Sequence, residues 1–494
     1  MNSRTTQQLL IQSLLLVMLL SSCSTKKNRW VNRQYHNTTA KYNGYFNGKE
    51  SIKKGLDKIN QNSEEDYSQI ITVFKENDLS ASKSAHSYMD KAIRKGSVVI
   101  QRHSMKIKGK EHCKWIDDNY LMIGKAYFYK GEFDEALKTF LFIIDEFKKT
   151  ETAYEAKIFT LRAYSEKNDF LACEDVIAEL NKKRTLNKKT KLFKHSSIAD
   201  CYLKQQNYSL ASDELKECIK LSNKKQASRL KYILAQVYQK VGNQKNAYEL
   251  FEDVIKESSD YEMTFNAKMN LAKSAIQTGI NVRKSKEALK KMLKDDKNKE
   301  YLDQIYFTIS EIDIAEMDTT ACINSLLNST KYSLENDVQK SLSFYNLAKI
   351  YYSKQEYRKA GLYYDSTIFY IDKNDEKYAE IFETSQNLNK LITNLDIVYM
   401  QDSLIALSVL PKNIQLELVN EIINNIIEIE KKEKEQKMLV EQSMYENSRY
   451  GSREQFGSKT SGGKWYFYNP STLSFGLSEF RKKWGKRKLE DDWR

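Results

Sequence analysis

The chain has 494 residues but only two prolines and 16 glycines. So few turn-forming residues exclude an all-β fold and favour long helices joined by short connections. The formal net charge is +14, and lysines alternate with acidic residues along most of the sequence. This spread of charge indicates many solvated helix faces rather than a groove for nucleic acid, so no nucleic-acid partner is expected.

Residues 1–22 have the pattern of a lipoprotein signal peptide. Arg4 precedes an apolar run over residues 9–20, which is too short to span a membrane as a helix. The run ends in Leu20-Ser-Ser-Cys23, the order of a bacterial lipobox; an ordinary signal peptide with a chance cysteine is the alternative. We expect acyl chains such as palmitate on Cys23, which would form a lasting anchor. Neither an aspartate nor an acidic run follows Cys23, which favours a protein anchored to the outer membrane on its periplasmic face.

Residues 23–110 are predicted to form the lipid anchor and an N-terminal helical region. Aromatic residues are frequent between 28 and 62, and residues 81–104 have the pattern of a further helix. Because the terminal units of a repeat array must present a polar outer face, these helices are expected to cap such an array.

A motif recurs between residues 115 and 375. It consists of a small residue, an aromatic residue three positions later, a small residue nine positions after that, and a bulky residue four further. The small residues let two helices approach closely, and the aromatic side chain fills the gap to the next pair. A glycine such as Gly131 or Gly242 ends the first helix. The clear copies are Gly124, Tyr127, Ala136 and Phe140; Ala199, Tyr202, Ala211 and Leu215; Ala235, Tyr238, Ala247 and Phe251; and Ala348, Tyr351, Ala360 and Tyr364, with a weaker copy at Leu161, Tyr164, Cys173 and Ile177.

This motif resembles the tetratricopeptide repeat. Degenerate copies fit around residues 272–275 and around residues 309–312 with Ala321, which makes about seven units of roughly 37 residues. The predicted fold class is all-α: a tetratricopeptide-repeat superhelical solenoid, followed by a flexible linker and a short C-terminal aromatic-basic segment. Such a solenoid offers a long concave face for peptides or proteins. A tyrosine-lined ligand groove is the less favoured alternative, because many tyrosines occupy packing positions.

Five cysteines remain besides Cys23. Their number is odd, their spacings are wide, and no C-x-x-C motif is present, which favours buried thiols over a disulfide framework. They are Cys113, Cys173, Cys201, Cys218 and Cys322.

Residues 376–442 have helical periodicity and contain an isoleucine stripe. We expect C-terminal helices that cap the solenoid and continue into a solvated extension; a coiled coil with a partner is the alternative. Residues 443–463 are rich in serine, glycine and arginine and predict a flexible linker. The stripe consists of Ile422, Ile423, Ile426 and Ile427.

Residues 464–494 are predicted to form an aromatic-basic docking tail. Aromatic and arginine side chains dominate binding hot spots, and a segment this short is too small to fold well alone. We expect the tail to dock on its own solenoid or, by preference, on a partner protein. The expected docking residues are Trp465, Tyr466, Phe467, Tyr468, Trp484, Trp493 and Arg494.

No sequence motif predicts an enzyme. The HExxH, GxSxG and GxGxxG patterns are absent, and the histidines are scattered without metal-ligand spacing. Residues 44–49 differ from a P-loop, since only three residues separate the glycines and Glu50 stands where a hydroxyl would hold magnesium. We therefore expect no enzymatic activity, no metal, no cofactor besides the covalent lipid on Cys23, and no small-molecule substrate.

The motifs at the two ends, taken together with the repeats, are more specific. The lipobox leads into Cys23-Ser-Thr-Lys-Lys-Asn28, and His36-Asn-Thr-Thr-Ala-Lys-Tyr-Asn-Gly-Tyr-Phe-Asn-Gly48 follows. After the repeats come Trp465-Tyr-Phe-Tyr-Asn-Pro470, Trp484-Gly and Leu489-Glu-Asp-Asp-Trp493. This combination resembles the PorW/SprE family of repeat lipoproteins of the Bacteroidota type IX secretion system. The resemblance covers nearly the whole chain up to Arg494, whereas longer members of the family continue past the last motif.

The resemblance implies a non-enzymatic periplasmic scaffold. It would link the outer-membrane translocon of that system to the periplasmic ring complex, and protein secretion and gliding motility would depend on it. Two other functions fit a helical-repeat lipoprotein. One is outer-membrane protein assembly, which the tail motifs do not support. The other is glycan capture for nutrient uptake, which would require surface exposure.

Overall fold

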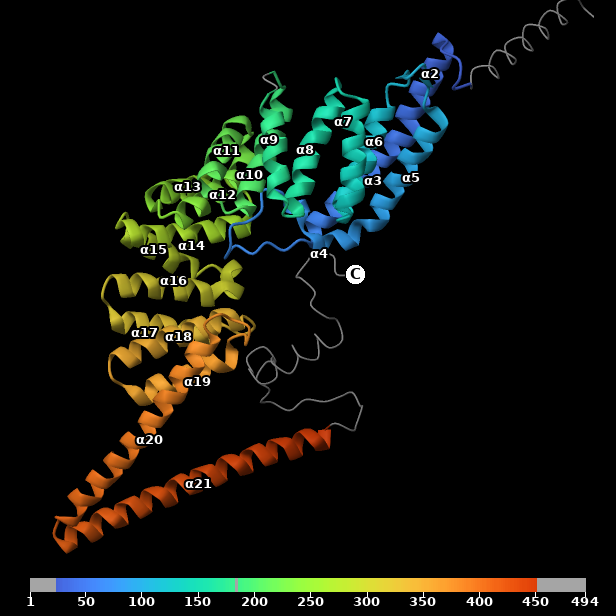
Figure 1. Cartoon of the computed structure of the whole chain (residues 1–494). Helices are drawn as coiled ribbons and strands as arrows, with labels where there is room; N and C mark the ends of the chain where they lie inside the picture. The colour runs from blue at the N-terminus through green and yellow to red at the C-terminus, as the bar shows by residue number, and fades with distance from the viewer. Residues whose placement is uncertain (1–23, 183–184, 451–494) are drawn as a thin grey trace, which may run out of the picture. The chain divides into compact units, whose positions relative to one another are not determined.

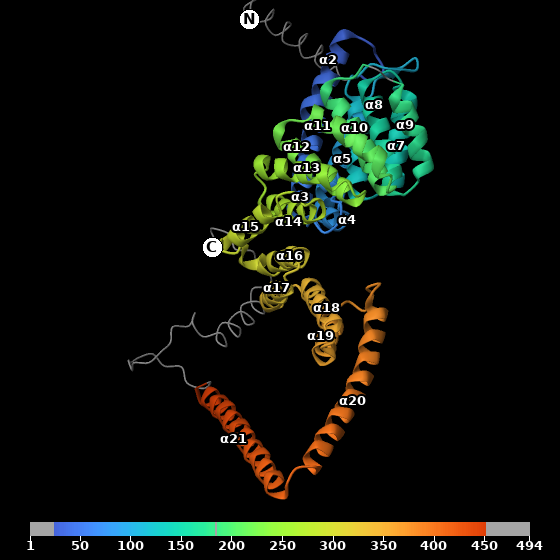
Figure 2. The ribbon, with the colours of Figure 1, turned by 90° about the vertical axis from the view of Figure 1, so that its left-hand side faces the viewer.

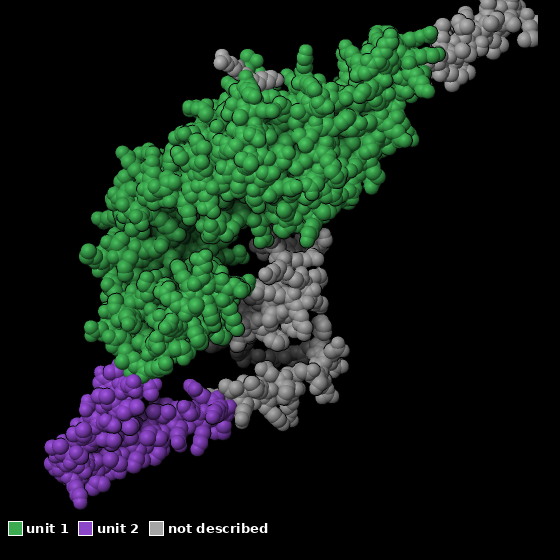
Figure 3. Space-filling model, viewed as in Figure 1, with its two compact units in different colours: residues 1–392 green, residues 393–494 purple. Residues whose placement is uncertain are grey.

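A computed structural model describes residues 24–182 and 185–450, with side chains up to residue 438. The chain divides into two compact units, Met1–Ile392 and Thr393–Arg494 (Figure 3). The predicted signal peptide, Cys23 and the whole predicted tail lie outside the described residues, as does most of the predicted linker.

The first unit opens with a nearly continuous helical stretch that packs on α5 and α6. An irregular connection follows it and carries the chain to α4, and a two-residue hairpin precedes the repeats, with Lys106 paired to Glu111 and Ile107 to Lys110. The elements are α2 (Trp30–Thr39), the π-helix η2 (Ala40–Tyr45), α3 (Phe46–Asn62), the 3-10 helix η3 (Lys75–Asn77), α4 (Leu79–Ser82), the 3-10 helix η4 (Lys83–Ala85), α5 (His86–His103), β1 (Lys106–Ile107) and β2 (Lys110–Glu111).

Glycines of the N-terminal motif allow this close packing. A Cβ atom on Gly44 would lie 1.9 Å from Val99 Cγ2 of α5, and one on Gly48 would lie 2.5 Å from the Met122 side chain of α6. Because such separations are far below van der Waals contact, larger residues would push the helices apart. The glycine spacing that superficially suggests a P-loop therefore serves helix packing.

Seven consecutive helix pairs form the described solenoid (Figures 1 and 2). Within each pair the two helices are joined by a short turn and pack against each other. The pairs are α6 (Ile116–Lys130) with α7 (Phe133–Glu146), α8 (Glu151–Glu166) with α9 (Phe170–Asn181), α10 (Lys188–Lys204) with α11 (Tyr208–Leu221), α12 (Lys224–Lys240) with α13 (Gln244–Glu257), α14 (Tyr261–Thr278) with α15 (Val282–Met292), α16 (Leu302–Ala315) with α17 (Thr319–Tyr332), and α18 (Asp337–Ser353) with α19 (Tyr357–Tyr370); the 3-10 helix η5 (Asp296–Tyr301) precedes α16.

The turn inside every pair contains a residue in the left-handed region. This conformation reverses the chain and lets backbone amides bond to the last carbonyls of the first helix. Glycine occupies the position in three turns, but larger residues hold it in the other four. The residues are Gly131, Asn168, Gln206, Gly242, Gly279, Met317 and Gln355.

The predicted packing residues lie at the contacts between helices. A Cβ atom on Gly124 would lie 2.4 Å from the Phe140 ring, so the glycine is what lets this ring reach α6. Tyr127, Tyr164 and Tyr238 are half-buried. The remaining predicted positions have 9% of their surface exposed or less: Ala136, Phe140, Ala199, Tyr202, Ala211, Ala235, Ala247, Phe251, Ala348, Tyr351 and Ala360.

The sixth pair departs from the sequence pattern. Ala321 was the predicted small residue, but Cys322 is the residue that is buried against the neighbouring helices, with 3% exposure. The tyrosine position of α16 holds Asp313, whose carboxylate lies 2.7 Å from Lys286 Nζ and accepts a hydrogen bond from Ser325 Oγ. A buried ion pair therefore replaces an aromatic contact here, and this obscures the repeat in the sequence.

The core is a series of small clusters along the solenoid rather than one central core. One cluster contains residues of α3, α5, α6, α7 and α8, and another contains residues of every helix from α10 through α14. A third contains residues of α17, α18, α19 and the start of α20. This arrangement follows from a fold in which each pair contacts only its neighbours. All five cysteines in the described residues are free and buried, as the sequence predicts.

Two long helices, α20 (Tyr378–Ser408) and α21 (Lys412–Tyr450), end the described chain. Ile381 and Leu388 of α20 are buried against the last pair, so the first part of this helix covers the end of the solenoid. The linker was predicted to begin at residue 443, but α21 continues to Tyr450. The physical reason is that residues 443–450 contain neither glycine nor proline, and the first glycine of the predicted linker is Gly451.

Within the described residues, no helix combines the length and the hydrophobicity needed to cross a membrane.

Candidate functional site

The main candidate site is a face of the solenoid that an internal segment crosses. This segment, which we call the strap, comprises residues 63–77 and is visible in Figure 1 as the blue connection leading to α4. It lies across α8, α10 and α12, and we call this face the groove. The sequence analysis did not identify the strap, although residues 63–74 separate two helical stretches and contain the β-branched run Ile70-Ile-Thr-Val73.

The strap consists of two stretches with the alternation of an extended chain, separated by a turn at residues 66–69, where the Gln69 amide donates to the Asp66 carbonyl. Ser63, Ile71 and Val73 are buried, whereas Glu64, Ser68 and Thr72 are exposed. Side chains of an extended segment point alternately to opposite sides, so one row faces the groove and the other faces away. Ile71 and Val73 thereby join the apolar cluster that α10, α12 and α14 form, and such side chains contribute roughly 1.5–3 kcal/mol each on full burial.

The groove binds the strap main chain through polar side chains of α12. Gln236 accepts a hydrogen bond from the Ile71 amide at 3.0 Å and donates one to the Gln69 carbonyl at 2.6 Å. Arg229 donates to the Thr72 carbonyl at 2.6 Å. These contacts satisfy backbone groups that have no sheet partner, which is why the extended conformation is stable here.

Two side chains near the start of the strap are also bound. Arg229 forms a bidentate ion pair with Glu65, at 2.7 and 2.5 Å, and the Glu65 side chain is only 9% exposed. The Tyr67 ring packs edge to face on Tyr232, with 5.5 Å between ring centroids. Burial raises the pKa of Tyr67 and that of Tyr232 well above the usual value, so both phenols remain neutral at physiological pH.

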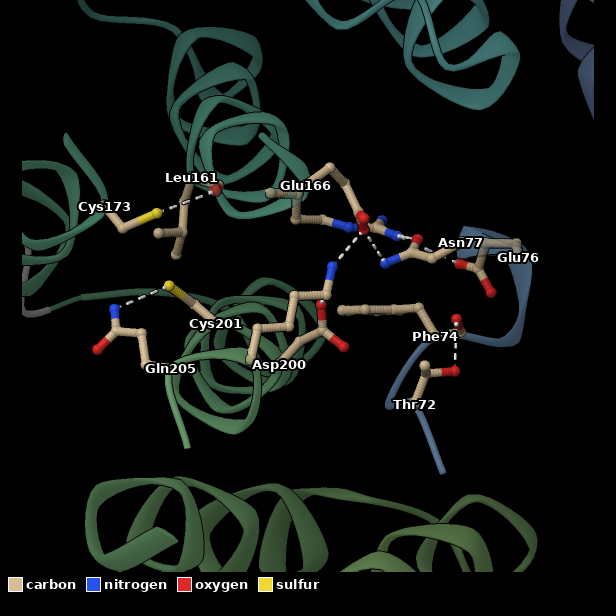
Figure 4. Close-up of polar contacts among 12 residues, drawn as sticks. Thr72, Phe74, Glu76, Asn77, Leu161, Glu166, Cys173, Asp200, Cys201 and Gln205 are labelled. Carbon is tan, nitrogen blue, oxygen red and sulfur yellow. Dashed lines mark hydrogen bonds and ion pairs between the residues drawn. The ribbon is translucent and has the colours of Figure 1, made fainter. Parts of the chain in front are cut away.

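The other end of the strap is held by Arg162 of α8. Its guanidinium lies 3.8 Å from the Phe74 ring centroid and donates to Asn77 Oδ1 at 2.6 Å. Asn77 in turn donates to Glu166, which also pairs with Lys204 of α10 at 2.6 Å. Figure 4 shows Asn77 of the strap joined to Glu166, with Glu76 on the other side of Asn77. Burial raises the pKa of Glu166, and its charge is balanced by Lys204 and Arg162.

Two pockets flank the strap. One has a volume of about 520 Å³ and a mixed lining that includes the polar residues Asp200, Lys204, Gln236 and Asn270. The other has about 770 Å³ and an aromatic wall, with charged side chains around it. Phe74, Tyr129, Phe159 and Phe193 form that wall, and the charged residues are Lys125, Glu151, Glu155, Lys189, Lys225 and Arg229. Both pockets are open to solvent beside a bound main chain, an arrangement suited to recognition of an extended segment.

Cys23 and the seven tail residues lie outside the described residues, so their roles stay predictions. In the part of the chain that the structure describes, no group of three or more histidine, cysteine, aspartate or glutamate side chains is arranged to hold a metal ion.

Three comparisons with known proteins were made, and the match to a family model agrees with the helical repeats. A tetratricopeptide-repeat model matches residues 117–141, which span α6 and the first part of α7. No curated protein matches the sequence significantly. Similar solved structures include the apo form of the quorum sensor NprR from B. thuringiensis, with 15% identity over 55% of this chain and 80% of that chain and a TM-score of 0.38.

Two further similar structures are tetratricopeptide-repeat proteins. One is the C-terminal part of a protein from Cytophaga hutchinsonii, with 13% identity over 53% of this chain and 98% of that chain and a TM-score of 0.39. The other comes from Parabacteroides merdae, with 15% identity over 60% and 98% and a TM-score of 0.30. The predicted fold class is confirmed: the chain contains a tetratricopeptide repeat within an α-helical solenoid, the architecture of protein-interaction scaffolds.

Proposed function

We propose that this protein is a non-enzymatic scaffold of the type IX protein secretion machinery, anchored by lipid on Cys23 to the periplasmic face of the outer membrane. It would connect the outer-membrane translocon to the periplasmic ring complex. The proposal rests on the presence of three features in one chain. These are a lipobox, a solenoid of helix pairs, and an aromatic-basic end with the motifs of the PorW/SprE family.

The physical chemistry of these features suits a connector. Acyl chains on Cys23 would hold one end of the chain at a membrane. A solenoid presents a large surface for its mass, because each helix pair adds exposed faces on both sides. Aromatic and arginine side chains at the far end of the sequence are of the types that anchor protein interfaces.

A deletion strain tests the proposal. Cargo proteins should be synthesised but retained in the periplasm, as mass spectrometry of culture supernatant and periplasmic fractions would show. Complementation with the unaltered chain should restore export, and complementation with Cys23→Ala should not. Normal export in the deletion strain would reject the proposal.

Two further measurements separate this function from the alternatives. The abundance of β-barrel proteins in the outer membrane should be unchanged in the deletion strain, whereas a role in their assembly would lower it. Protease applied to intact cells should leave the protein uncut, whereas a surface protein that captures glycans would be digested.

A further inference from the structure

We propose that the groove is a binding surface for extended segments, which the strap occupies as a built-in ligand, and that a partner segment of the same chemistry takes the place of the strap. This binding property goes beyond the proposed function and does not depend on it.

The contacts of the groove are those of peptide recognition. Gln236 bonds to both an amide and a carbonyl of the strap, and Arg229 bonds to a further carbonyl. Contacts to the main chain hold any extended segment, whatever its side chains. The groove therefore requires an extended conformation first and a particular sequence second.

The side-chain contacts define the partner. Arg229 requires an acidic residue at the position of Glu65, and Tyr232 receives an aromatic ring two residues later. The apolar cluster takes an aliphatic side chain at the position of Ile71, and the Arg162 guanidinium receives a second aromatic ring three residues further on. The fitting ligand is thus a segment with an acidic and an aromatic anchor, then a turn, and then an extended stretch with an aliphatic and a second aromatic anchor.

A partner segment can displace the strap from the groove more readily than it could displace a helix. From residue 63 to residue 74 it has no regular secondary structure, and its main-chain contacts to the groove are made by side chains. Because the strap belongs to no helix pair, we expect its opening to require only local unfolding, with loss of the Ile71 and Val73 contacts. The pockets of about 520 and 770 Å³ on either side give an incoming segment space to lodge before the strap has left.

A synthetic, fluorescently labelled peptide with the sequence of residues 63–77 provides the probe. Its affinity is measured by fluorescence anisotropy for the full chain and for the full chain with Tyr67→Ala and Ile71→Ala, which loosen the strap. Because the strap competes with the peptide, the loosened chain should bind at least about tenfold more tightly than the unaltered chain. Equal affinities, or no binding to either protein, would overturn the proposal.

Two controls locate the peptide. Adding Arg229→Ala to the loosened chain should weaken its binding, since the partner of Glu65 is lost. A peptide in which the residues corresponding to Tyr67 and Ile71 are alanine should bind more weakly than the original. If either change leaves the affinity intact, the peptide binds elsewhere and the proposal fails.

Hydrogen exchange on the unaltered chain keeps the proposal testable even if the loosened chain does not fold. The Ile71 amide, bonded to Gln236, should exchange at least about tenfold faster than the interior amides of α12, because the strap opens locally. Exchange of both at one common rate would show that the strap leaves only when the solenoid unfolds, and would overturn the proposal.

Discussion

At the residue scale, Arg162 has the most unusual environment among the residues of the groove. Its side chain is 1% exposed, and its guanidinium forms only a long ion pair, at 3.8 Å, with the Glu76 carboxylate. Four aromatic rings surround the guanidinium, and these rings stabilise its charge through cation–π contacts. The distances to their centroids are 3.8 Å for Phe74, 4.8 Å for Phe128, 5.2 Å for Phe159 and 5.7 Å for Phe193.

We therefore expect Arg162→Ala to lower the free energy of unfolding by about 3 kcal/mol, from lost cation–π contacts and an unsatisfied Asn77. Urea denaturation followed by circular dichroism measures this change. Arg283→Ala is the matched control, because the Arg283 side chain is 92% exposed and should leave the midpoint unchanged. Equal midpoints for the two variants would contradict the assigned role of Arg162.

A second residue-scale prediction concerns the His36 and His103 pair, which joins α2 to α5. Their Nδ1 atoms lie 2.9 Å apart, and burial lowers the pKa of both imidazoles below the usual 6.5. The charges of His36 and Arg102 lower the pKa of His103 further. The two histidines of the unfolded chain thus take up protons at a higher pH than those of the folded chain. The contribution of this pair to the free energy of unfolding is therefore present above pH 6.5 and is lost as the pH falls below that value.

The expected result is a steeper loss of stability between about pH 7 and pH 5 in the unaltered chain than in His103→Asn. Thermal unfolding across this pH range measures the difference. His36→Asn should reduce the slope in the same way, and the double variant should add little, because one coupled pair is removed in each case. Parallel pH profiles for all four proteins would show that the pair does not titrate as described.

At the element scale, the turns within helix pairs show how one geometry accepts different residues. The left-handed position holds Gly131, Gly242 and Gly279 in three pairs, but Asn168, Gln206, Met317 and Gln355 in the others. A residue with a Cβ atom is strained there, since its side chain approaches its own carbonyl oxygen. Packing of the two helices outweighs this cost, and so the sequence shows no glycine at these four turns.

Met317→Gly should therefore raise the free energy of unfolding by about 0.5–1 kcal/mol, because strain is relieved and the side chain, 91% exposed, makes little contact. Gly242→Ala should have the opposite effect, at about 1 kcal/mol, since its surroundings are open and only the backbone conformation resists the change. Chemical denaturation measures both. Shifts of the same sign would contradict this account of the turns.

The repeats themselves could be predicted because their contacts are local. Gly124 and Phe140 are close in sequence and meet within one helix pair, so their spacing records the contact directly. The sixth pair could not be placed accurately, since Asp313 and Lys286 form a charged contact that no spacing of small and aromatic residues reveals. Similarly, Cys322 is small enough to pack where Ala321 was expected.

At the scale of the whole molecule, the protein comprises two units whose surfaces differ. The first buries apolar side chains along the solenoid, while the described part of the second leaves the isoleucine stripe half exposed. The exposed fractions are 51% for Ile422, 45% for Ile423, 50% for Ile426 and 57% for Ile427. Within the first unit, the first part of α20 caps the solenoid as predicted, because Ile381 and Leu388 are buried there.

At the scale of the whole molecule, we also predict that the tail tryptophans anchor a partner protein. Replacing Trp484 and Trp493 with alanine should reduce the yield of secretion-system proteins in a pull-down several-fold, because aromatic anchors dominate interfaces. The melting temperature should change little. Replacement of both by phenylalanine is the matched control and should retain most of the yield. An unaltered yield with the alanine variant would remove the tail from the proposed connector.

The sequence by itself determined the helical class, the period of the repeats and the buried positions within pairs, because these depend on neighbours close along the chain. Only the tertiary structure decided that residues 63–77 lie on helices 85 or more positions later, as the bonds from Arg162 to Asn77 and from Ile71 to Gln236 show. Period and composition carry no record of such a contact. Burial of Ile71 and Val73, and the pairing of Glu65 with Arg229, become favourable only when the solenoid has formed the groove that receives them.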